Sequence, residues 1–304
     1  MENLGKKLGH IIIPLATPFK KGSQDIDYTA AAELANYVIE NKHCDSLVVG
    51  GTSGEFNSMS LDERLELFRI VKGAVNGRVP LVGGACSDST REAIQLAQES
   101  EKLGLDAVMV LGPCYCKPTQ QGAYLHFSAI AKATSLPVML YNIPIFMGFN
   151  LEKETLGRLV ENHSNIVAIK DEAGINPTQM SDFSHVTPKD FTIYNGDDIM
   201  VLCGLAQGAA GVVSGSSIII GKQMRTMINR FLAGDIKGAR EIHMQLDPLF
   251  KAFGSNGRTN PIPLWKAAIN LCGLNVGVPR MPLEPATADE IEIMRGHLMR
   301  LGVI

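Results

Sequence analysis

The feature that most restricts the fold of this chain is a series of eight apolar runs, each three to five residues long, separated by segments with helical periodicity. The runs are His10–Pro14, Ser46–Val49, Pro80–Val82, Ala107–Leu111, Pro137–Leu140, Ile166–Ile169, Phe191–Tyr194 and Gly211–Val213. Their apolar residues are continuous and do not alternate with polar ones, which is typical of strands in a parallel sheet covered on both faces.

The segments between these runs have apolar residues at three- and four-residue spacing, as in amphipathic helices. They are Tyr28–Asn41, Leu61–Val75, Thr90–Leu103, Gln120–Thr134, Leu151–Glu161, Pro177–His185 and Ile199–Gln207. Ser60 and Glu63 form a capping-box pattern, and Pro177 is predicted in a first helical turn. The alternation of strand and helix predicts an α/β fold.

After the eighth run, four helical segments follow with no strand between them. They are Gly221–Ala233, Ile236–Phe253, Pro263–Cys272 and Ala288–Leu301. Eight strand–helix units followed by helices favour a closed (β/α)8 TIM barrel with a C-terminal helical extension, and an open doubly wound sheet is the alternative. We predict a catalytic barrel over residues 1–222 and a helical domain over residues 223–304.

Composition bears on the partners of the protein. The 304 residues carry a net charge of −3 and no cluster of Lys and Arg, so we expect a small-molecule substrate and no nucleic-acid or membrane partner. The apolar stretch Ile11–Ile13 is interrupted by Pro14 and Pro18, which predicts a cytoplasmic protein. Cys114 and Cys116 lack the further ligands of a zinc cluster, so no metal site is expected.

In such a barrel, the residues just after each strand form the active site. Lys170 directly follows the sixth run, where a neutral amine can attack a carbonyl. Tyr141 follows the fifth run, and its phenol can transfer a proton. Both residues also have a purely structural interpretation, in which Lys170 extends to solvent and Tyr141 covers the core.

The loops after three other runs are rich in glycine, hydroxyl or acidic residues. Residues 50–55, after the second run, offer backbone N–H groups and hydroxyls for a carboxylate or phosphate, or form a simple turn. The last two runs are followed by Gly196-Asp197-Asp198 and by a serine-rich loop at residues 214–217, where other barrels bind phosphate. A phosphosugar isomerase or lyase is therefore an alternative, although the acidic pair would repel phosphate. Asp198 is alternatively a helix cap.

Taken together, these segments resemble the dihydrodipicolinate synthase / N-acetylneuraminate lyase family of class I, Schiff-base barrel enzymes. The resemblance covers nearly the whole chain. The matching segments are Gly51–Glu55, Pro113–Pro118, Tyr141–Pro144, Ile169–Lys170, Gly196–Asp198 and Asn260–Pro263.

The resemblance implies that Lys170 forms a Schiff base with a 2-oxo acid and that Tyr141 is the acid/base phenol beside it. Thr52 and Tyr115 would extend a proton relay, with Tyr115 reaching in from a neighbouring subunit of a homo-oligomer, usually a dimer of dimers. Thr52 and Ser53 would hold the substrate carboxylate. No metal or organic cofactor is implied, because the protonated imine is itself the electron sink. The other residues expected at the substrate are Gly196, Asp197, Phe146 and Val213.

Two departures from the family pattern bear on the substrate. Phe146 stands where dihydrodipicolinate synthases usually carry a carboxylate-binding arginine, although Lys117 or Arg258 could supply a substitute charge. Ile199 stands where neuraminate lyases carry an acidic residue. We therefore expect a lyase or aldolase acting on pyruvate or a 2-keto-3-deoxy (sugar) acid. The alternative is 4-hydroxy-tetrahydrodipicolinate synthase, which condenses pyruvate with aspartate semialdehyde, and a non-catalytic scaffold is less favoured.

Overall fold

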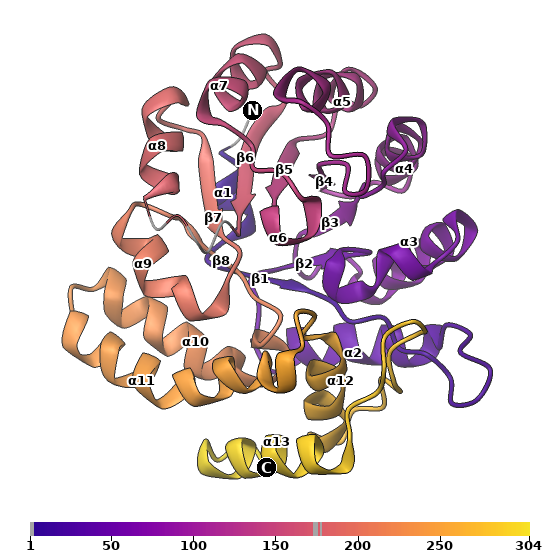
Figure 1. Cartoon of the computed structure of the whole chain (residues 1–304), viewed down its shortest axis with the longest axis vertical. Coiled ribbons are helices and arrows are strands. Elements are labelled where there is room, and N and C mark those ends of the chain that lie inside the picture. The colour runs from indigo at the N-terminus through magenta and orange to yellow at the C-terminus, as the bar shows by residue number, and fades with distance from the viewer. Residues whose placement is uncertain (1–2, 173–175, 177) are drawn as a thin grey trace.

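The computed structural model of the chain describes residues 3–172, 176 and 178–304. Its centre is a closed barrel of eight parallel strands, in which β1 pairs with both β2 and β8 (Figure 1). The strands are β1 (Ile11–Pro14), β2 (Ser46–Val49), β3 (Leu81–Gly84), β4 (Ala107–Leu111), β5 (Val138–Asn142), β6 (Ile166–Asp171), β7 (Thr192–Asn195) and β8 (Gly211–Val213). Closure confirms the predicted (β/α)8 barrel and excludes the open sheet.

Helices surround the barrel, as Figure 1 shows. The main helices of this ring are α2 (Tyr28–Glu40), α3 (Leu61–Val75), α4 (Thr90–Lys102), α5 (Gln120–Lys132), α7 (Lys153–Asn162), α8 (Gln179–Val186), α9 (Val201–Ala206) and α10 (Ser217–Leu232). The capping box at the start of α3 is confirmed, because Ser60 and Glu63 each accept a hydrogen bond from the other's backbone N–H. The predicted first-turn proline, Pro177, lies outside the described residues.

The C-terminal helical extension is also confirmed. It consists of α11 (Ile236–Ala252), α12 (Ile262–Leu271) and α13 (Ala288–Arg300). Helix α11 packs against α10, and α13 packs against α12 and α11. Helix α10 spans residues 222 and 223. The predicted division of the chain into two domains at this point stays a prediction. In the described part of the chain, no helix combines the length and apolar character needed to cross a membrane.

Six short helices complete the part of the chain that the structure describes. They are α1 (Leu4–Leu8), α6 (Pro144–Met147) and the 3-10 helices η1 (Thr52–Gly54), η2 (Phe56–Ser58), η3 (Asp198–Met200) and η4 (Ser255–Gly257). Helix α1 lies at the amino end of the barrel, where the Ser46 hydroxyl donates to the carbonyl of Leu8 and the Tyr194 hydroxyl to that of Gly9. With this end covered, a ligand has access from the carboxyl ends of the strands.

Two buried clusters hold the fold together. The larger one lies between the strands and the surrounding helices, and the smaller one fills the barrel. The smaller cluster includes Ile12, Val48, Val82, Met109, Met139, Tyr141, Ala168, Tyr194 and Val213. Burial of each large apolar side chain stabilises the fold by about 1.5–3 kcal/mol. Tyr141 and Val213 therefore belong both to this packed interior and to the lining of the pocket above it.

Candidate active site

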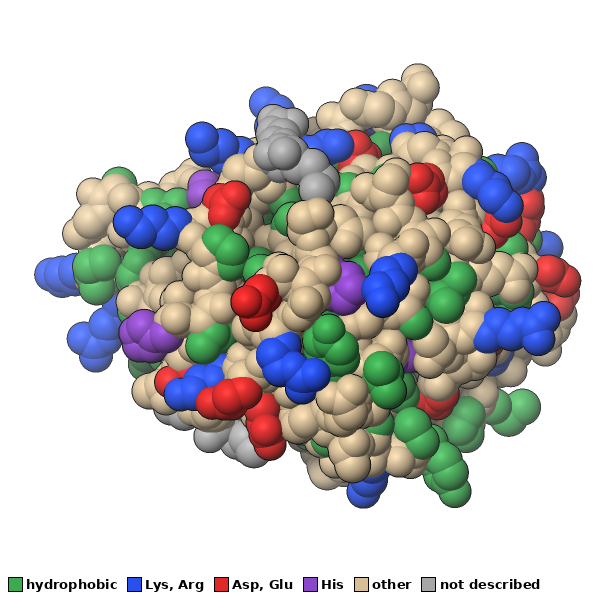
Figure 2. Space-filling model, turned by 90° about the horizontal axis from the view of Figure 1, so that it is seen from above, with side chains coloured by type: hydrophobic (Ala, Val, Ile, Leu, Met, Phe, Trp, Pro, Cys, Tyr) green, Lys and Arg blue, Asp and Glu red, His purple; other side chains and the backbone are tan. Residues whose placement is uncertain are grey.

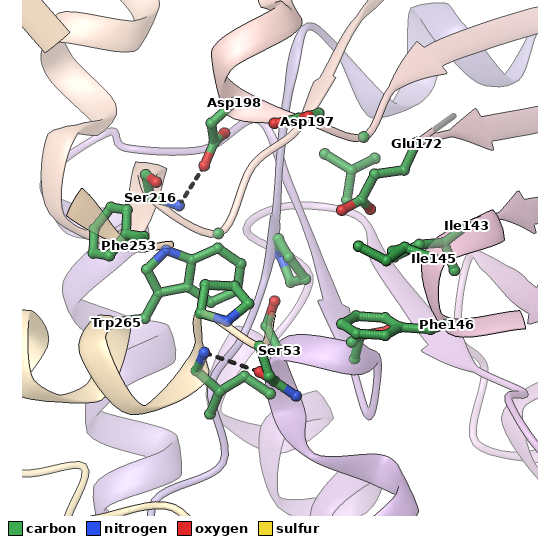
Figure 3. A pocket seen from close by; sticks show the side chains of 18 of the residues that line it. Ser53, Ile143, Ile145, Phe146, Glu172, Asp197, Asp198, Ser216, Phe253 and Trp265 are labelled. Atoms are coloured by element: carbon green, nitrogen blue, oxygen red, sulfur yellow. Dashed lines mark hydrogen bonds between the residues drawn. The ribbon is translucent and has the colours of Figure 1, made fainter. Parts of the chain in front are cut away.

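A pocket of about 570 Å³ lies at the carboxyl ends of the barrel strands. Barrel residues form its floor and one side, and α6 contributes Phe146. The C-terminal extension covers the opposite side with Phe253 and Trp265 (Figure 3), and its Phe250 also lines the pocket. The extension thus contributes directly to the lining, which the division into a catalytic barrel and a separate helical domain did not predict.

Lys170, Tyr141 and Glu172 form the polar centre of this pocket. Strands β5 and β6 pair in parallel and bring Tyr141 opposite Lys170. The ammonium nitrogen of Lys170 lies 3.9 Å from the centre of the Tyr141 ring and 3.0 Å from Oε2 of Glu172. The Tyr141 hydroxyl donates to the same Oε2 over 2.7 Å. One carboxylate oxygen therefore contacts both the amine and the phenol.

The surroundings of Tyr141 keep its phenol protonated. Burial raises the pKa of Tyr141 well above its usual value, and the charge and hydrogen bond of Glu172 raise it further. The Thr52 side chain acts in the opposite direction and lowers this pKa, and its hydroxyl has no hydrogen-bond partner in the described residues. A phenol in this state is a proton donor, and the buried Thr52 hydroxyl is left available for a ligand.

Two further carboxylates face the pocket from the segment after β7. Burial, and then the charge of Glu172, raise the pKa of Asp197 to about 6. Burial also raises the pKa of Asp198, which accepts a hydrogen bond of 3.0 Å from the backbone N–H of Ser216. The interpretation of Asp198 as a helix cap is wrong, because Asp197 is the residue that caps η3 and accepts from the N–H of Ile199.

The loop that carries Thr52 and Ser53 is held by the C-terminal extension. Glu55, at the end of η1, pairs with Lys266 of α12 over 2.6 Å, and both side chains are 1% exposed. The backbone N–H of Arg280 donates to the other oxygen of Glu55 over 2.8 Å. A loop anchored at a buried ion pair presents its hydroxyls to the pocket in a fixed position.

The structure brings together most of the residues that the sequence predicted for the site. Lys170 and Tyr141 share the pocket with Thr52, Ser53, Gly196, Asp197, Phe146 and Val213. Gly196 allows Lys170 to approach closely, because a Cβ at this position would lie 2.7 Å from Cε of the lysine. Tyr115 is the exception: it is 93% exposed and does not line the pocket of its own chain.

Sequence reasoning missed several residues of the pocket, above all Glu172. The sequence predicts site residues directly after each apolar run, whereas Glu172 lies one residue beyond the end of β6. An acidic residue two positions after a candidate nucleophile is a signal that could have identified it. In the described residues, no group of three or more His, Cys, Asp or Glu side chains is arranged to hold a metal ion.

A closed eight-stranded barrel with a lysine amine and a phenol in contact at its carboxyl end has the architecture of the class I, Schiff-base aldolases and lyases. Comparison with known proteins narrows this class. The model of the Dihydrodipicolinate synthetase family matches residues 7–299, so the chain belongs to this family of Schiff-base aldolases and is an enzyme.

The chain is similar along its whole length to curated and solved members of the family. It is 43% identical over 296 residues to the 4-hydroxy-tetrahydrodipicolinate synthase of Desulforamulus reducens, covering 97% of this chain and 98% of that protein. It is 45% identical over 287 residues to the enzyme of the same name from Desulforudis audaxviator, covering 94% and 95%. A crystal structure of the Cyanidioschyzon merolae enzyme with lysine bound superposes with a TM-score of 0.93 at 41% identity, covering 98% and 99%.

These comparisons confirm the family that the sequence motifs indicated. They favour the synthase, which the sequence analysis held as the alternative, over the 2-keto-3-deoxy acid aldolase that it preferred.

Proposed function

We propose that this enzyme forms an imine between Lys170 and the C2 carbonyl of pyruvate or a related 2-oxo acid, and then makes or breaks the bond between C3 and C4. The observation that carries the proposal is the contact of Lys170, 5% exposed, with both Tyr141 and Glu172 at the pocket. Burying a lysine has a free-energy cost, which is offset when the amine is paired and used chemically.

The geometry supports a role for each group in imine formation. Glu172, 3.0 Å from the amine, takes the proton that Lys170 must lose before it attacks C2. The carbinolamine oxygen then leaves as water with a proton from Tyr141, and the imine nitrogen becomes cationic. Tyr141 recovers its proton from Glu172 along the hydrogen bond between them, which restores the Glu172 carboxylate. Thr52 and Ser53 bind the carboxylate of the 2-oxo acid through their hydroxyls and backbone N–H groups.

The cationic imine drives the carbon chemistry. It withdraws electrons from C3, so that C3 loses a proton to the hydrogen-bonded pair of Glu172 and Tyr141, or its bond to C4 breaks, and an enamine results. Addition of an aldehyde to the enamine is the reverse of that cleavage. Glu172 stabilises the positive charge on the imine nitrogen, because its carboxylate lies within ion-pair distance of that position.

Two acceptors have support of different kinds. The names of the full-length relatives support condensation of pyruvate with aspartate semialdehyde, as in a 4-hydroxy-tetrahydrodipicolinate synthase. Phe146 supports a different aldehyde, such as that released from a 2-keto-3-deoxy acid, because a phenyl ring cannot bind the carboxylate of aspartate semialdehyde.

We also propose that the enzyme works as a homo-oligomer in the cytoplasm, in which Tyr115 completes the proton relay of a neighbouring subunit. Its high exposure in the single chain supports this role, because large aromatic side chains are usually covered. On the face shown in Figure 2, acidic and basic side chains are interspersed, as expected for an enzyme with a small-molecule substrate. Sedimentation and the activity of Tyr115→Phe test the oligomer.

The test of imine chemistry is exchange of the pyruvate methyl protons in D2O, followed by proton NMR. Reversible enamine formation exchanges these protons, so the wild-type enzyme accelerates the loss of the methyl signal. Lys170→Ala should return the rate to that of buffer, whereas Lys189→Ala, at an exposed surface lysine, should leave it unchanged. Wild-type exchange in Lys170→Ala would contradict the proposal.

A further inference from the structure

We propose that the acceptor half of this pocket binds a neutral, mainly apolar aldehyde and discriminates against an aldehyde that carries a carboxylate. In the cleavage direction, the same group is the substituent on C4 of the 2-oxo acid. This inference rests on the proposed function and deepens it, because it names the chemical class of the second substrate.

Apolar side chains form two walls of the pocket. Figure 3 shows Phe146 and Ile145 on one side and Trp265 and Phe253 on the other. The rings of Phe253 and Trp265 pack edge to face, with centroids 5.9 Å apart and an interplanar angle of 71°. Walls of this kind bind an apolar chain or ring and leave the hydroxyls of a sugar chain without partners on these two sides.

The charged side chains of the pocket also favour a neutral aldehyde over an anionic one. Lys170 is the only cation among the described residues that line it, and the imine uses that nitrogen. The pocket is also lined by three acidic residues, Glu172, Asp197 and Asp198. Residues 173–175 and 177, which lie outside the described residues, are Ala, Gly, Ile and Pro and carry no charged side chain. A second carboxylate would therefore lose its water and meet acidic groups without a cation to pair with.

The two basic residues that could have replaced the missing arginine are not in place to do so within one chain. The Arg258 guanidinium donates to both carboxylate oxygens of Glu290, over 2.8 and 3.0 Å, and to two backbone carbonyls. Lys117 packs against Gly148, and neither basic residue lines the pocket. No basic side chain among the described lining residues therefore takes the place of the arginine that synthases usually carry at the position of Phe146.

One residue of the aromatic wall carries an unpaired neutral donor. The indole N–H of Trp265 is buried and has no hydrogen-bond partner within the described part of the chain. An unpaired buried donor is unfavourable unless a ligand or water satisfies it.

The reaction that follows is balanced and needs no further reactant. C3 of the enamine attacks the aldehyde carbon, the new C3–C4 bond forms, and the electron pair of the carbonyl π bond moves to its oxygen. That oxygen takes a proton from Tyr141 and becomes the 4-hydroxyl. Water then hydrolyses the imine, which releases a 4-hydroxy-2-oxo acid and the free amine of Lys170.

The test compares two aldehydes of similar length that differ in charge, 4-methylbenzaldehyde and 4-formylbenzoate, with glyceraldehyde and aspartate semialdehyde as further acceptors. Borohydride trapping of the pyruvate imine is done first on a separate portion of every sample, because the reduced enzyme can no longer turn over. We expect kcat/KM for condensation to be at least about tenfold higher for 4-methylbenzaldehyde than for 4-formylbenzoate, since binding an unpaired carboxylate is strongly disfavoured.

Variants connect this preference to the apolar wall. Phe146→Arg should reduce the ratio between the neutral and the anionic aldehyde by about tenfold or more, because it restores a cation. Ile145→Arg, at a more exposed position of the same wall, is a second variant in case Phe146→Arg does not fold. Ile236→Arg makes the matched change on the exposed face of α11, away from the pocket, and should leave the ratio unchanged.

The outcomes separate this inference from the proposed function. A sample that traps the pyruvate imine but accepts the anionic aldehydes as well as the neutral one, or accepts no neutral aldehyde, would overturn the inference alone. An unchanged ratio in both arginine variants of the wall would do the same. Failure to trap any imine in the wild-type enzyme would instead overturn the proposed function, and the inference with it.

Discussion

The change Glu172→Gln tests the group that connects the amine and the phenol. Glutamine keeps the size of the side chain and can still accept a hydrogen bond, but it carries no charge. Glu172 accepts from the Tyr141 hydroxyl over 2.7 Å and pairs with Lys170 over 3.0 Å, so one substitution weakens two charge-assisted contacts.

The size of the effect follows from these contacts. A hydrogen bond to a charged group is worth about 1.5–3 kcal/mol and one between neutral groups about 0.5–1.5 kcal/mol, so the two contacts together lose roughly 2–3 kcal/mol. At about 1.4 kcal/mol for each factor of ten, kcat should fall by about 10²-fold. Partial exposure of Glu172 to solvent makes this an upper estimate.

The pH profile gives a second readout that loss of packing would not produce. The charge and the hydrogen bond of Glu172 both raise the pKa of Tyr141, so the substitution should lower that pKa. Because Tyr141 acts as a proton donor in its protonated form, the alkaline limit of kcat should move to lower pH. Glu161→Gln, at an exposed acid of α7, is the matched control. A variant with wild-type kcat and an unshifted profile would refute the role given to Glu172.

The remaining predictions concern the phenol and the extension. Tyr141→Phe should lower turnover by roughly 10²-fold or more in a folded protein, as expected for loss of an acid/base group, and unchanged turnover would return Tyr141 to a structural role. Arg258 lowers the pKa of Glu290 from 4.5 to about 2, so this pair stabilises the fold above pH 4.5 and the stability is lost as the pH falls through 2. Glu290→Gln should therefore reduce the free energy of unfolding near neutral pH by up to about 3 kcal/mol in denaturant titrations, and an equal loss at pH 2 would contradict the assignment.

The strands could be predicted from the sequence because both faces of a parallel barrel are covered, which leaves a continuous apolar run for each strand. The main helices could be predicted from their periodicity, whereas α1 and α6 are too short for any period to appear. Ser60 identified the start of α3 correctly because its capping box depends only on neighbouring residues.

The candidate site was only partly predictable for a related reason. Lys170 and Tyr141 follow directly after apolar runs, so their place at the barrel mouth follows from the fold. Trp265 and Phe253 reach the pocket only because the C-terminal helices fold back over it, and no local pattern encodes that placement. The cap was assigned to Asp198 where the structure has Asp197, because adjacent acids are equally good caps in the sequence and only the backbone geometry of η3 distinguishes them.

Borohydride trapping with pyruvate, read by intact mass and peptide mapping, tests the central claim most directly. Reduction converts the imine into a stable secondary amine, so the wild-type enzyme should gain the mass of one reduced pyruvate unit on the peptide that contains Lys170. Lys170→Ala should give no adduct, while Lys189→Ala should give the full yield. An adduct at full yield in Lys170→Ala, or one mapped to another lysine such as Lys266, would contradict the account.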